Sequence, residues 1–413
     1  MMDPSSRRGA IRAPLVLTSS ASPPARRDAL DRPTEIRDAA LAWQDGILTY
    51  VGAASGLDPR QHGSVHDARG ATIVPGFVDA HTHLPFVGWR AEEYEMRIAG
   101  RTYRDLHGEG GIPRSARQLA AATDEDVLAF CAPLLREMLD HGTTALELKT
   151  GYGLSVDGEL RQARIARRLA ERAPQTCTVT LLACHAVPEG VDRRSWVETV
   201  CSELVPLAAT ERLVDAVDVY VEDIAFDLDD LRSVARAADR ASLPLRVHAD
   251  QLGSSSAAEA AVALGARTAD HLNHTGSAGV RALGGGATAA VLLPASTFVL
   301  GAPLPPVRDL VEAGAPVVIA TDLNPGTSPT ASMPEAMAIA CTLYRLSPRE
   351  ALVAATANAA WALGLHGRLG GLDVGKRADF LVLDASDIRE VPYRPGHNPV
   401  VDAYVGGMRE GGR

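Results

Sequence analysis

Short apolar runs alternate with longer amphipathic segments through the middle of the chain, from about residue 71 onward. The intervening segments, such as Gly158–Ala173 and Leu228–Ala241, carry apolar residues at helical spacing among many Ala and Arg residues. This alternation predicts parallel strands joined by helices. The apolar runs are Thr72–Val78, Thr143–Leu148, Cys177–Cys184, Val214–Val221, Pro244–Val247, Arg267–His271, Thr288–Leu293 and Pro316–Ala320. Eight strand–helix units close a (β/α)8 barrel, so we predict an α/β protein with this TIM-like fold. No G-x-G-x-x-G motif follows the first run, which argues against a doubly wound sheet.

The two ends of the chain have a different pattern. Residues from about 11 to 65 and from about 367 to 413 are short strand-like pieces interrupted by Gly, Pro and Asp. Examples are Ala40–Trp43, Ile47–Val51 and Asp379–Leu383. We predict one small β-sandwich domain built from both termini beside the barrel. The expected division is residues 1–70 and 367–413 for the sandwich and residues 71–366 for the barrel.

Composition narrows the class of protein. Hydrophobic residues make up 46% and charged residues 22%, as in ordinary soluble globular proteins. The formal net charge of -10 gives no reason to expect a nucleic-acid partner. No apolar stretch approaches the length of a signal peptide or membrane span. The five cysteines are widely spaced without a C-x-x-C pair, which is typical of reduced thiols. We therefore expect a cytoplasmic protein.

Metal-ligand side chains follow several of the predicted strands. His81 and His83 end the first run, and their spacing places both imidazoles on one side of an extended chain. Similar groups end the fifth, sixth and eighth runs, namely His248, Asp270 with His271, and Asp322. In such a barrel the carboxyl ends of all strands form one rim, where active sites lie. Any one of these groups alone would more simply be a buried structural residue, but together they indicate a site.

The residue types favour one divalent transition metal ion, zinc or iron, per subunit. We assign His81, His83, His248 and Asp322 as metal ligands, with water completing the shell. His271 is either a fifth ligand or, as we prefer, a base that hydrogen-bonds this water. A two-metal site in barrels of this type usually needs a bridging lysine carbamate, and the chain has two lysines, Lys149 and Lys376. Lys149 ends the second run, where we expect its charge to meet a neighbouring carboxylate, and Lys376 lies in the C-terminal strands. Neither lysine is therefore expected to bridge two ions, and a site for one metal ion is favoured.

The motifs at these positions resemble those of the amidohydrolase superfamily. The broad resemblance lies in Pro75–His83, His248–Gln251 and Thr321-Asp322. Narrower motifs are similar to those of the members that open the imidazolone ring, and they are Lys149–Leu154, His185–Pro188, Ala269–Leu272 and Ala320–Pro329. The similarity runs from about Gly46 to Asn398. It implies metal-dependent hydrolysis of the cyclic amide of 4-imidazolone-5-propanoate to N-formimidoyl-L-glutamate in histidine degradation.

The resemblance also implies roles for individual residues. By matching position, the substrate contacts are Arg90, Tyr152, His185, Gln251, Asn324, Gly326 and Thr327. An arginine such as Arg90 can bind a carboxylate through two parallel hydrogen bonds, and His185 can hydrogen-bond a developing oxyanion. Gln251 can bind a ring N–H but cannot transfer protons. The catalytic residues are therefore expected to be Asp322 and His271, which move the proton, together with His185.

Other functions stay open on the sequence alone. One alternative is a deaminase of an aminated heterocycle on the same scaffold, although such enzymes often place a glutamate where this chain has Gln251. Another is a non-catalytic scaffold homologue, but such relatives typically lose metal ligands that are present here. The segment Gly108–Ile112 departs from the longer glycine run expected and lacks the Thr-Arg pair that follows it. This loop bears on substrate choice. A homodimer is expected by analogy with the architecture.

Overall fold

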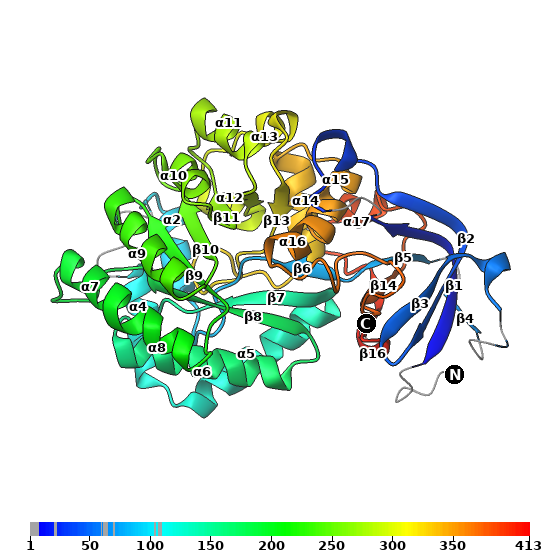
Figure 1. Ribbon diagram of the computed structural model, residues 1–413, viewed down its shortest axis with the longest axis horizontal. Coiled ribbons are helices and arrows are strands. Elements are labelled where there is room, and N and C mark those ends of the chain that lie inside the picture. The colour runs from blue at the N-terminus through cyan, green and yellow to red at the C-terminus, as the bar shows by residue number, and fades with distance from the viewer. Residues whose placement is uncertain are drawn as a thin grey trace.

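The larger part of the structure is a barrel of parallel strands surrounded by helices, with a second sheet at one side (Figure 1). This computed structural model describes residues 8–19, 23–58, 60, 65–68, 71–102, 105 and 110–413. Within these residues the barrel strands are β6 (Phe77–Asp79), β7 (Thr143–Lys149), β8 (Thr176–Cys184), β9 (Ala216–Val221), β10 (Leu245–Ala249), β11 (Thr268–His271), β12 (Ala289–Leu292) and β13 (Val317–Ile319). Neighbours along the chain pair in sequence order, so the predicted barrel is confirmed.

The barrel closes just beyond the ends of its first and last strands. An isolated parallel bridge joins Thr82 to Leu323. The Asp322 N–H donates to the His81 carbonyl at 3.0 Å, and the His83 N–H donates to the Leu323 carbonyl at 2.9 Å. The seam of the barrel therefore lies among the predicted metal ligands, which fixes their backbones relative to one another.

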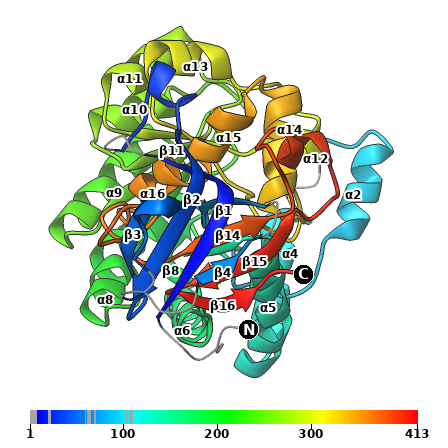
Figure 2. The ribbon, with the colours of Figure 1, turned by 90° about the vertical axis from the view of Figure 1, so that its right-hand side faces the viewer.

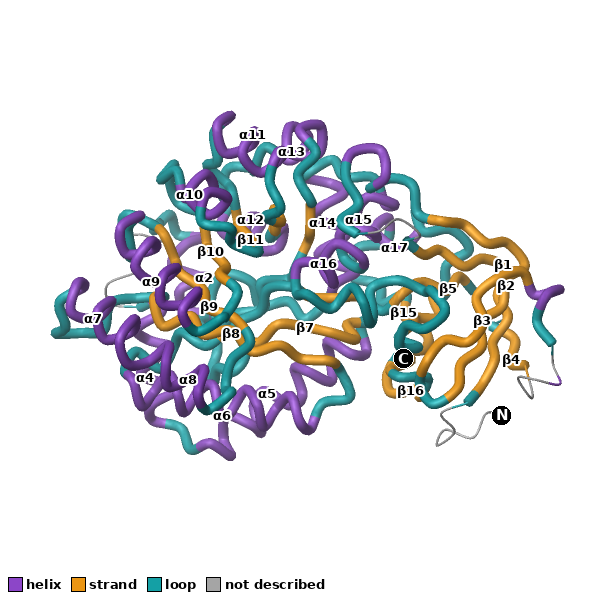
Figure 3. Tube along the Cα trace, viewed as in Figure 1, coloured by secondary structure: helices purple, strands orange, loops and turns teal. Residues whose placement is uncertain are grey.

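Helices cover the outside of the barrel (Figure 3). They are α2 (Ala91–Ile98), α4 (Gly111–Ala121), α5 (Asp124–Asp140), α6 (Val156–Arg172), α7 (Arg193–Thr199), α8 (Val205–Thr210), α9 (Leu228–Arg240), α10 (Ala257–Ala263), α11 (Ser277–Gly285), α12 (Pro294–Leu300), α13 (Val307–Ala313), α14 (Met333–Leu343), α15 (Pro348–Ala354), α16 (Ala357–Ala362) and α17 (Glu390–Tyr393). The two segments predicted from periodicity correspond to α6 and α9 within two residues. Each begins at a polar cap: the Ser155 hydroxyl and the Asp227 carboxylate accept from backbone N–H groups of the first turn.

Both termini contribute to the second sheet, in which the C-terminal strands lie beside the N-terminal ones (Figure 2). Its strands are β1 (Gly9–Thr18), β2 (Thr34–Gln44), β3 (Ile47–Ala53), β4 (Val65–Asp67), β5 (Thr72–Pro75), β14 (Phe380–Leu383), β15 (Val400–Val405) and β16 (Met408–Gly411). The order is β16-β15-β14-β5-β1-β2-β3, with β4 paired to β1. The Trp43 ring on β2 packs 5.3 Å from Phe380 and 5.8 Å from Tyr404. Because β2 is not a neighbour of β14 or β15 in the sheet, this contact means that the sheet curls over its own apolar core.

One predicted strand is divided between the two sheets. We expected Thr72–Val78 to be the first barrel strand, but Thr72–Pro75 is β5 of the terminal sheet, and the barrel strand β6 starts at Phe77. A Cβ atom on the intervening Gly76 would lie 2.1 Å from the Thr144 side chain, so this close crossing requires glycine. The sequence does not reveal this division into two strands, because the residues on both sides of Gly76 are buried and mostly apolar. The domain boundaries at residues 70/71 and 366/367 stay predictions. No helix of the described residues is long and apolar enough to cross a membrane.

Candidate metal centre and active site

Four predicted ligands converge at the rim of the barrel. The Nε2 atom of His83 lies 3.2 Å from Nε2 of His81 and 3.4 Å from Nε2 of His248. The Asp322 Oδ1 atom lies 3.3 Å from His83 Nε2 and 3.6 Å from His81 Nε2. All four side chains are at most 5% exposed. The structure therefore brings together ligand types from strands that are far apart in the sequence.

The spacing of these atoms fits a transition metal ion. Ligand atoms in a tetrahedral shell with bonds of about 2.0–2.1 Å stand about 3.3–3.4 Å apart, which matches the separations above. Asp322 Oδ1 has no hydrogen-bond partner among the described residues although it is buried, and an orphaned carboxylate oxygen facing imidazole nitrogens calls for a cation. The residues present thus fit a metal ion.

The protonation of the site also suits a metal ion. Burial lowers the pKa of His83, and it lowers the pKa of His81 well below the usual value for histidine. Both imidazoles are then neutral at neutral pH, as metal ligation requires. Burial raises the pKa of Asp322, but the adjacent imidazole of His83, followed by those of His271 and His248, outweighs it and lowers the pKa below its usual value. The Asp322 carboxylate thus faces the neutral imidazoles of His81 and His83.

A layer of buried ionic side chains lies behind the ligands. His81 Nδ1 hydrogen-bonds Asp270 Oδ2 at 2.7 Å, and His248 Nδ1 lies 3.0 Å from Asp218 Oδ2. Lys149 Nζ lies 2.6 Å from the same Asp218 oxygen and 2.9 Å from Glu147 Oε2. The expectation that Lys149 meets a neighbouring carboxylate is therefore confirmed.

His271 and Asp322, the predicted proton carriers, both stand at sharp turns of the chain. Their φ angles are 76° and 57°, in the left-handed region that residues other than glycine rarely adopt. Burial lowers the pKa of His271 to about 3, so its imidazole is neutral at neutral pH. The ring of His271 stands 5.2 Å from that of His248, centroid to centroid, beside the ligand cluster. The strained turns hold both side chains at the inner edge of the rim.

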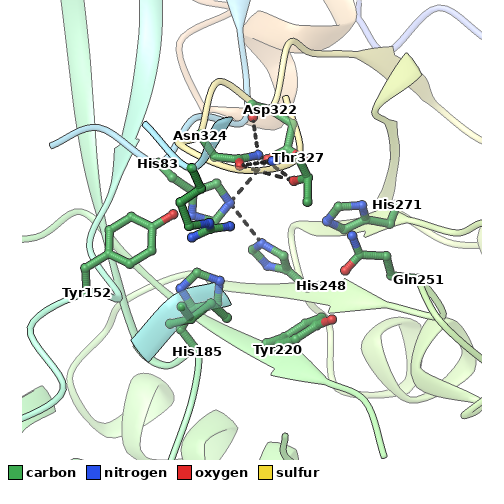
Figure 4. A pocket seen from close by; sticks show the side chains of 12 residues that line it. His83, Tyr152, His185, Tyr220, His248, Gln251, His271, Asp322, Asn324 and Thr327 are labelled. Carbon is green, nitrogen blue, oxygen red and sulfur yellow. Dashed lines mark hydrogen bonds and ion pairs between the residues drawn. The ribbon is translucent and has the colours of Figure 1, made fainter. Parts of the chain in front are cut away.

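A cavity opens over this cluster (Figure 4). It is lined by His83, Arg90, Ile112, Tyr152, His185, Tyr220, His248, Gln251, His271, Asp322, Asn324 and Thr327. Six of the seven predicted substrate contacts thus face one cavity, and Gly326 is the exception. In Figure 4, Gln251 and His271 lie on the opposite side of His83 from Tyr152. Tyr220 and Ile112 were not among the predicted site residues. Tyr220 shares the inward face of β9 with Asp218 at a spacing of two, a weak signal that strand alternation provides.

Arg90 is buried and held by the start of α4. Its Nη1 donates to the Gly111 carbonyl at 3.0 Å and to the Ser115 hydroxyl at 2.8 Å. The Glu93 carboxylate lies 3.2 Å from Arg90 Nε. Gly326 packs against this guanidinium so closely that a Cβ atom there would lie 1.9 Å from Nη2. The place of Gly326 is thus to leave room for Arg90. Of the segment Gly108–Ile112, Gly108 and Glu109 lie outside the described residues.

The loop that carries Tyr152 is held by two buried side chains of α6. The Gln162 Oε1 atom accepts from the N–H groups of Gly151 and Tyr152 at 3.1 and 2.9 Å. The Glu159 carboxylate accepts from the N–H groups of Gly151, Gly153 and Leu154 at 3.1, 2.7 and 3.0 Å. His185 hydrogen-bonds the Gly151 carbonyl at 3.1 Å through Nδ1. These bonds fix Tyr152 and His185 side by side on one wall, with ring centroids 5.4 Å apart.

Two further loops carry the remaining contacts. Asn324 Oδ1 accepts from the Gly326 and Thr327 N–H groups at 2.9 and 2.7 Å, which shapes the turn after β13. The Gln251 N–H donates to Glu222 Oε1 at 2.6 Å. Burial raises the pKa of Glu222 to about 7. Glu222 follows β9 and was not predicted, because its partner lies on another strand and no local motif marks it.

Comparison with known proteins places the chain in a family. The model of the family described as "Amidohydrolase family" matches residues 72–409. An imidazolonepropionase of Rubrobacter xylanophilus is 47% identical over 332 residues, which are 80% of this chain and 80% of that protein. An imidazolonepropionase of Deinococcus radiodurans is 42% identical over 91% of this chain and 92% of that protein. The E. coli guanine deaminase structure has a TM-score of 0.75, covers 98% of this chain and 100% of its own, and shares 18% identity, so it indicates the fold alone. The chain belongs to the amidohydrolase family, within the group whose members are named imidazolonepropionase.

Proposed function

We propose that this protein hydrolyses the cyclic amide of 4-imidazolone-5-propanoate to N-formimidoyl-L-glutamate, a step of histidine degradation. The observation that carries the proposal is the cavity in which Arg90, Tyr152, His185 and Gln251 face the histidine cluster, in a chain that is 42–47% identical to proteins named imidazolonepropionase. The cavity lining offers a buried cation for a carboxylate tail together with a hydrolytic centre for the ring.

The cofactor in this proposal is one divalent ion per subunit, zinc or iron. Its ligands would be His81, His83, His248 and Asp322, supported by the spacing of 3.2–3.6 Å among their donor atoms. Such an ion, when bound, lowers the pKa of water from about 15.7 toward 7 and polarises a carbonyl group. The protein's own residues then have to orient the ring and move one proton.

Substrate recognition is assigned to seven residues around the cavity. They are Arg90, Tyr152, His185, Gln251, Asn324, Gly326 and Thr327. Arg90 would bind the propanoate carboxylate, because its planar guanidinium matches a carboxylate and is already oriented by Gly111 and Ser115. Gln251 would bind a ring N–H. Gly326 would act indirectly, by giving the Arg90 guanidinium its space.

The chemistry assigned to the catalytic residues is a single proton relay. Asp322, assisted by the neutral His271, accepts a proton as the oxygen of water attacks the ring carbonyl carbon. His185 lines the cavity and its Nδ1–H donates to the Gly151 carbonyl, so it would donate from Nε2 to the oxygen that becomes negative only as the protonated imidazolium. The ring C–N bond then breaks, and the proton passes from Asp322 or His271 to the leaving nitrogen. The water oxygen stays on the carbon as part of the new carboxyl group, and its second proton is lost to solvent when that group ionises to the carboxylate.

The direct test is incubation of the purified protein with imidazolonepropionate, with and without a chelator. We expect loss of imidazolone absorbance with formation of formimidoylglutamate, abolished by the chelator and restored by zinc or iron. Ammonia release without formimidoylglutamate would instead indicate a deaminase. No reaction and no bound metal would contradict the proposal and favour a non-catalytic homologue. We further expect a cytoplasmic homodimer, which mass measurement in solution tests.

A further inference from the structure

Each of two candidate ligands has its far ring nitrogen against a buried carboxylate. His81 presents Nε2 to the cluster and hydrogen-bonds Asp270 through Nδ1 at 2.7 Å. His248 presents Nε2 to the cluster, and its Nδ1 lies 3.0 Å from Asp218. The first contact is a hydrogen bond and the second a close ion-pair distance. In both cases one ring nitrogen of the imidazole is directed at the candidate ion and the other at a carboxylate.

The two carboxylates share one counterion. Lys149 Nζ lies 2.6 Å from Asp218 Oδ2 and 3.8 Å from Asp270 Oδ2, and all three side chains are fully buried. Isolated carboxylates at this depth would cost too much free energy to stay charged, whereas a buried ammonium offsets that cost. Lys149 therefore favours the charged form of both carboxylates, more strongly for Asp218 at 2.6 Å than for Asp270 at 3.8 Å, and it also stands where a further cation would otherwise be attracted.

We infer that Asp270 and Asp218, held by Lys149, are positioning residues that set the affinity of the protein for its metal ion. A carboxylate on Nδ1 fixes the imidazole tautomer, so that the Nε2 lone pair points at the ion, and it makes the imidazole a stronger donor. The ring orientation is fixed before the ion arrives. This inference rests on the ligand set proposed above, in which His81 and His248 bind through Nε2.

The same buried layer supplies a matched control. Glu147 is also fully buried, and its carboxylate lies 2.9 Å from Lys149 Nζ and 2.9 Å from Arg246 Nε. It also accepts from the Thr180 hydroxyl. These partners of Glu147 within the described residues, namely Lys149, Arg246 and Thr180, include no histidine. Glu147→Gln and Asp270→Asn thus each remove one buried negative charge next to Lys149, but Asp270→Asn alone alters a histidine contact.

The experiment measures zinc affinity of the full-length protein, made metal-free, in competition with a chromophoric chelator. Asp270→Asn should weaken zinc binding about 10- to 100-fold, the range typical of such outer partners, and Asp218→Asn by about 10-fold or less. Glu147→Gln should stay within about threefold of wild type. Equal losses in Asp270→Asn and Glu147→Gln, or unchanged affinity in Asp270→Asn, would overturn the inference. If Asp270→Asn does not fold, Asp218→Asn against Glu147→Gln decides the question at His248.

A second readout does not depend on turnover. In the zinc-loaded wild-type protein with ¹⁵N-labelled histidine, the Nδ1–H of His81 should give a downfield proton resonance that exchanges slowly with water. This resonance should shift or vanish in Asp270→Asn and persist in Glu147→Gln. Its persistence in Asp270→Asn would overturn the inference. If the wild-type protein binds no divalent ion, both the inference and the proposed function are wrong. If the wild-type protein binds zinc and turns over substrate but the Asp270→Asn results contradict expectation, only the role inferred for Asp270 is wrong.

Discussion

The barrel rim and the terminal sheet enclose interiors of opposite character. Inside the terminal sheet, the core consists of apolar and aromatic residues such as Trp43, Phe380 and Ile11. At the rim of the barrel, the buried side chains include histidines, carboxylates and a fully buried lysine. Apolar burial stabilises a fold by about 25 cal/mol per Å², whereas each buried charge costs free energy unless it is paired. The rim therefore contributes less to stability than its depth suggests, and its residues are explained by chemistry.

This difference predicts that substitutions in the two regions separate activity from stability. Changes at the rim should reduce turnover while leaving the fold largely intact. Changes in the terminal sheet should reduce stability while leaving the turnover of folded molecules unchanged. The four substitutions below test this separation, beginning with the largest expected effect.

Asp322→Asn should lower kcat by about 10³- to 10⁴-fold, because the substitution removes both a proton acceptor and a charged metal ligand. The near-ultraviolet circular dichroism and the melting temperature should stay close to those of wild type. Asp384→Asn is the control, since Asp384 pairs with His397 just after β14 and is not among the residues that line the cavity. Steady-state kinetics on imidazolonepropionate measure the effect. Wild-type kcat in Asp322→Asn would refute the assignment of Asp322.

Trp43→Ala should lower the free energy of unfolding by about 3–5 kcal/mol, as large-to-small substitutions in cores do. Trp43 is 1% exposed and loses its packing on Phe380 and Tyr404 in this variant. The urea midpoint measures the change, and Trp43→Phe should show a smaller one. kcat per folded molecule should equal that of wild type. A matching loss of kcat would mean that the terminal sheet supports the site more directly than its contacts indicate.

Sequence patterns predicted the parts of the molecule that depend on local periodicity. The eight apolar runs located the barrel strands, because strands and helices differ in period whatever they pack against. The convergence of His81, His83, His248 and Asp322 followed from one geometric rule, that parallel strands end at a common rim. His248 lies near the end of β10, and the other three follow the ends of β6 and β13 within a few residues, so local position and chemistry agreed.

Features that depend on partners distant in the sequence were not predictable. The division of Thr72–Val78 between two sheets depends on Gly76 crossing against Thr144, and both halves are equally apolar. Likewise, Glu222 has no motif, since its importance comes from the Gln251 N–H on the loop after another strand. The layer behind the ligands is of the same kind: Asp270 was recognised only as the neighbour of His271.

Arg90→Lys should raise KM for imidazolonepropionate about 10- to 100-fold with a smaller change in kcat. A lysine supplies the charge but not the planar pair of donors, and it also loses the bonds to Gly111 and Ser115. Arg409→Lys, in β16 of the terminal sheet, is the matched control and should leave KM unchanged. An unchanged KM in Arg90→Lys would show that Arg90 does not bind the substrate, and another cationic side chain would then have to bind the propanoate carboxylate.

Glu222→Gln should change how the free energy of unfolding depends on pH. Burial raises the pKa of Glu222 from 4.5 to about 7 in the folded protein. Between these values the folded state holds a proton that the unfolded state has released, so the free energy of unfolding falls as pH rises through this window. Glutamine lacks this titration, so the variant should gain on wild type by up to about 3 kcal/mol between pH 4.5 and 7.5, at about 1.4 kcal/mol for each pH unit between the two pKa values. Urea midpoints at both pH values measure the gain, with exposed Glu189→Gln as the control. A constant difference across the window would show that Glu222 titrates alike in both states, and the rim would then carry one buried charge at no cost.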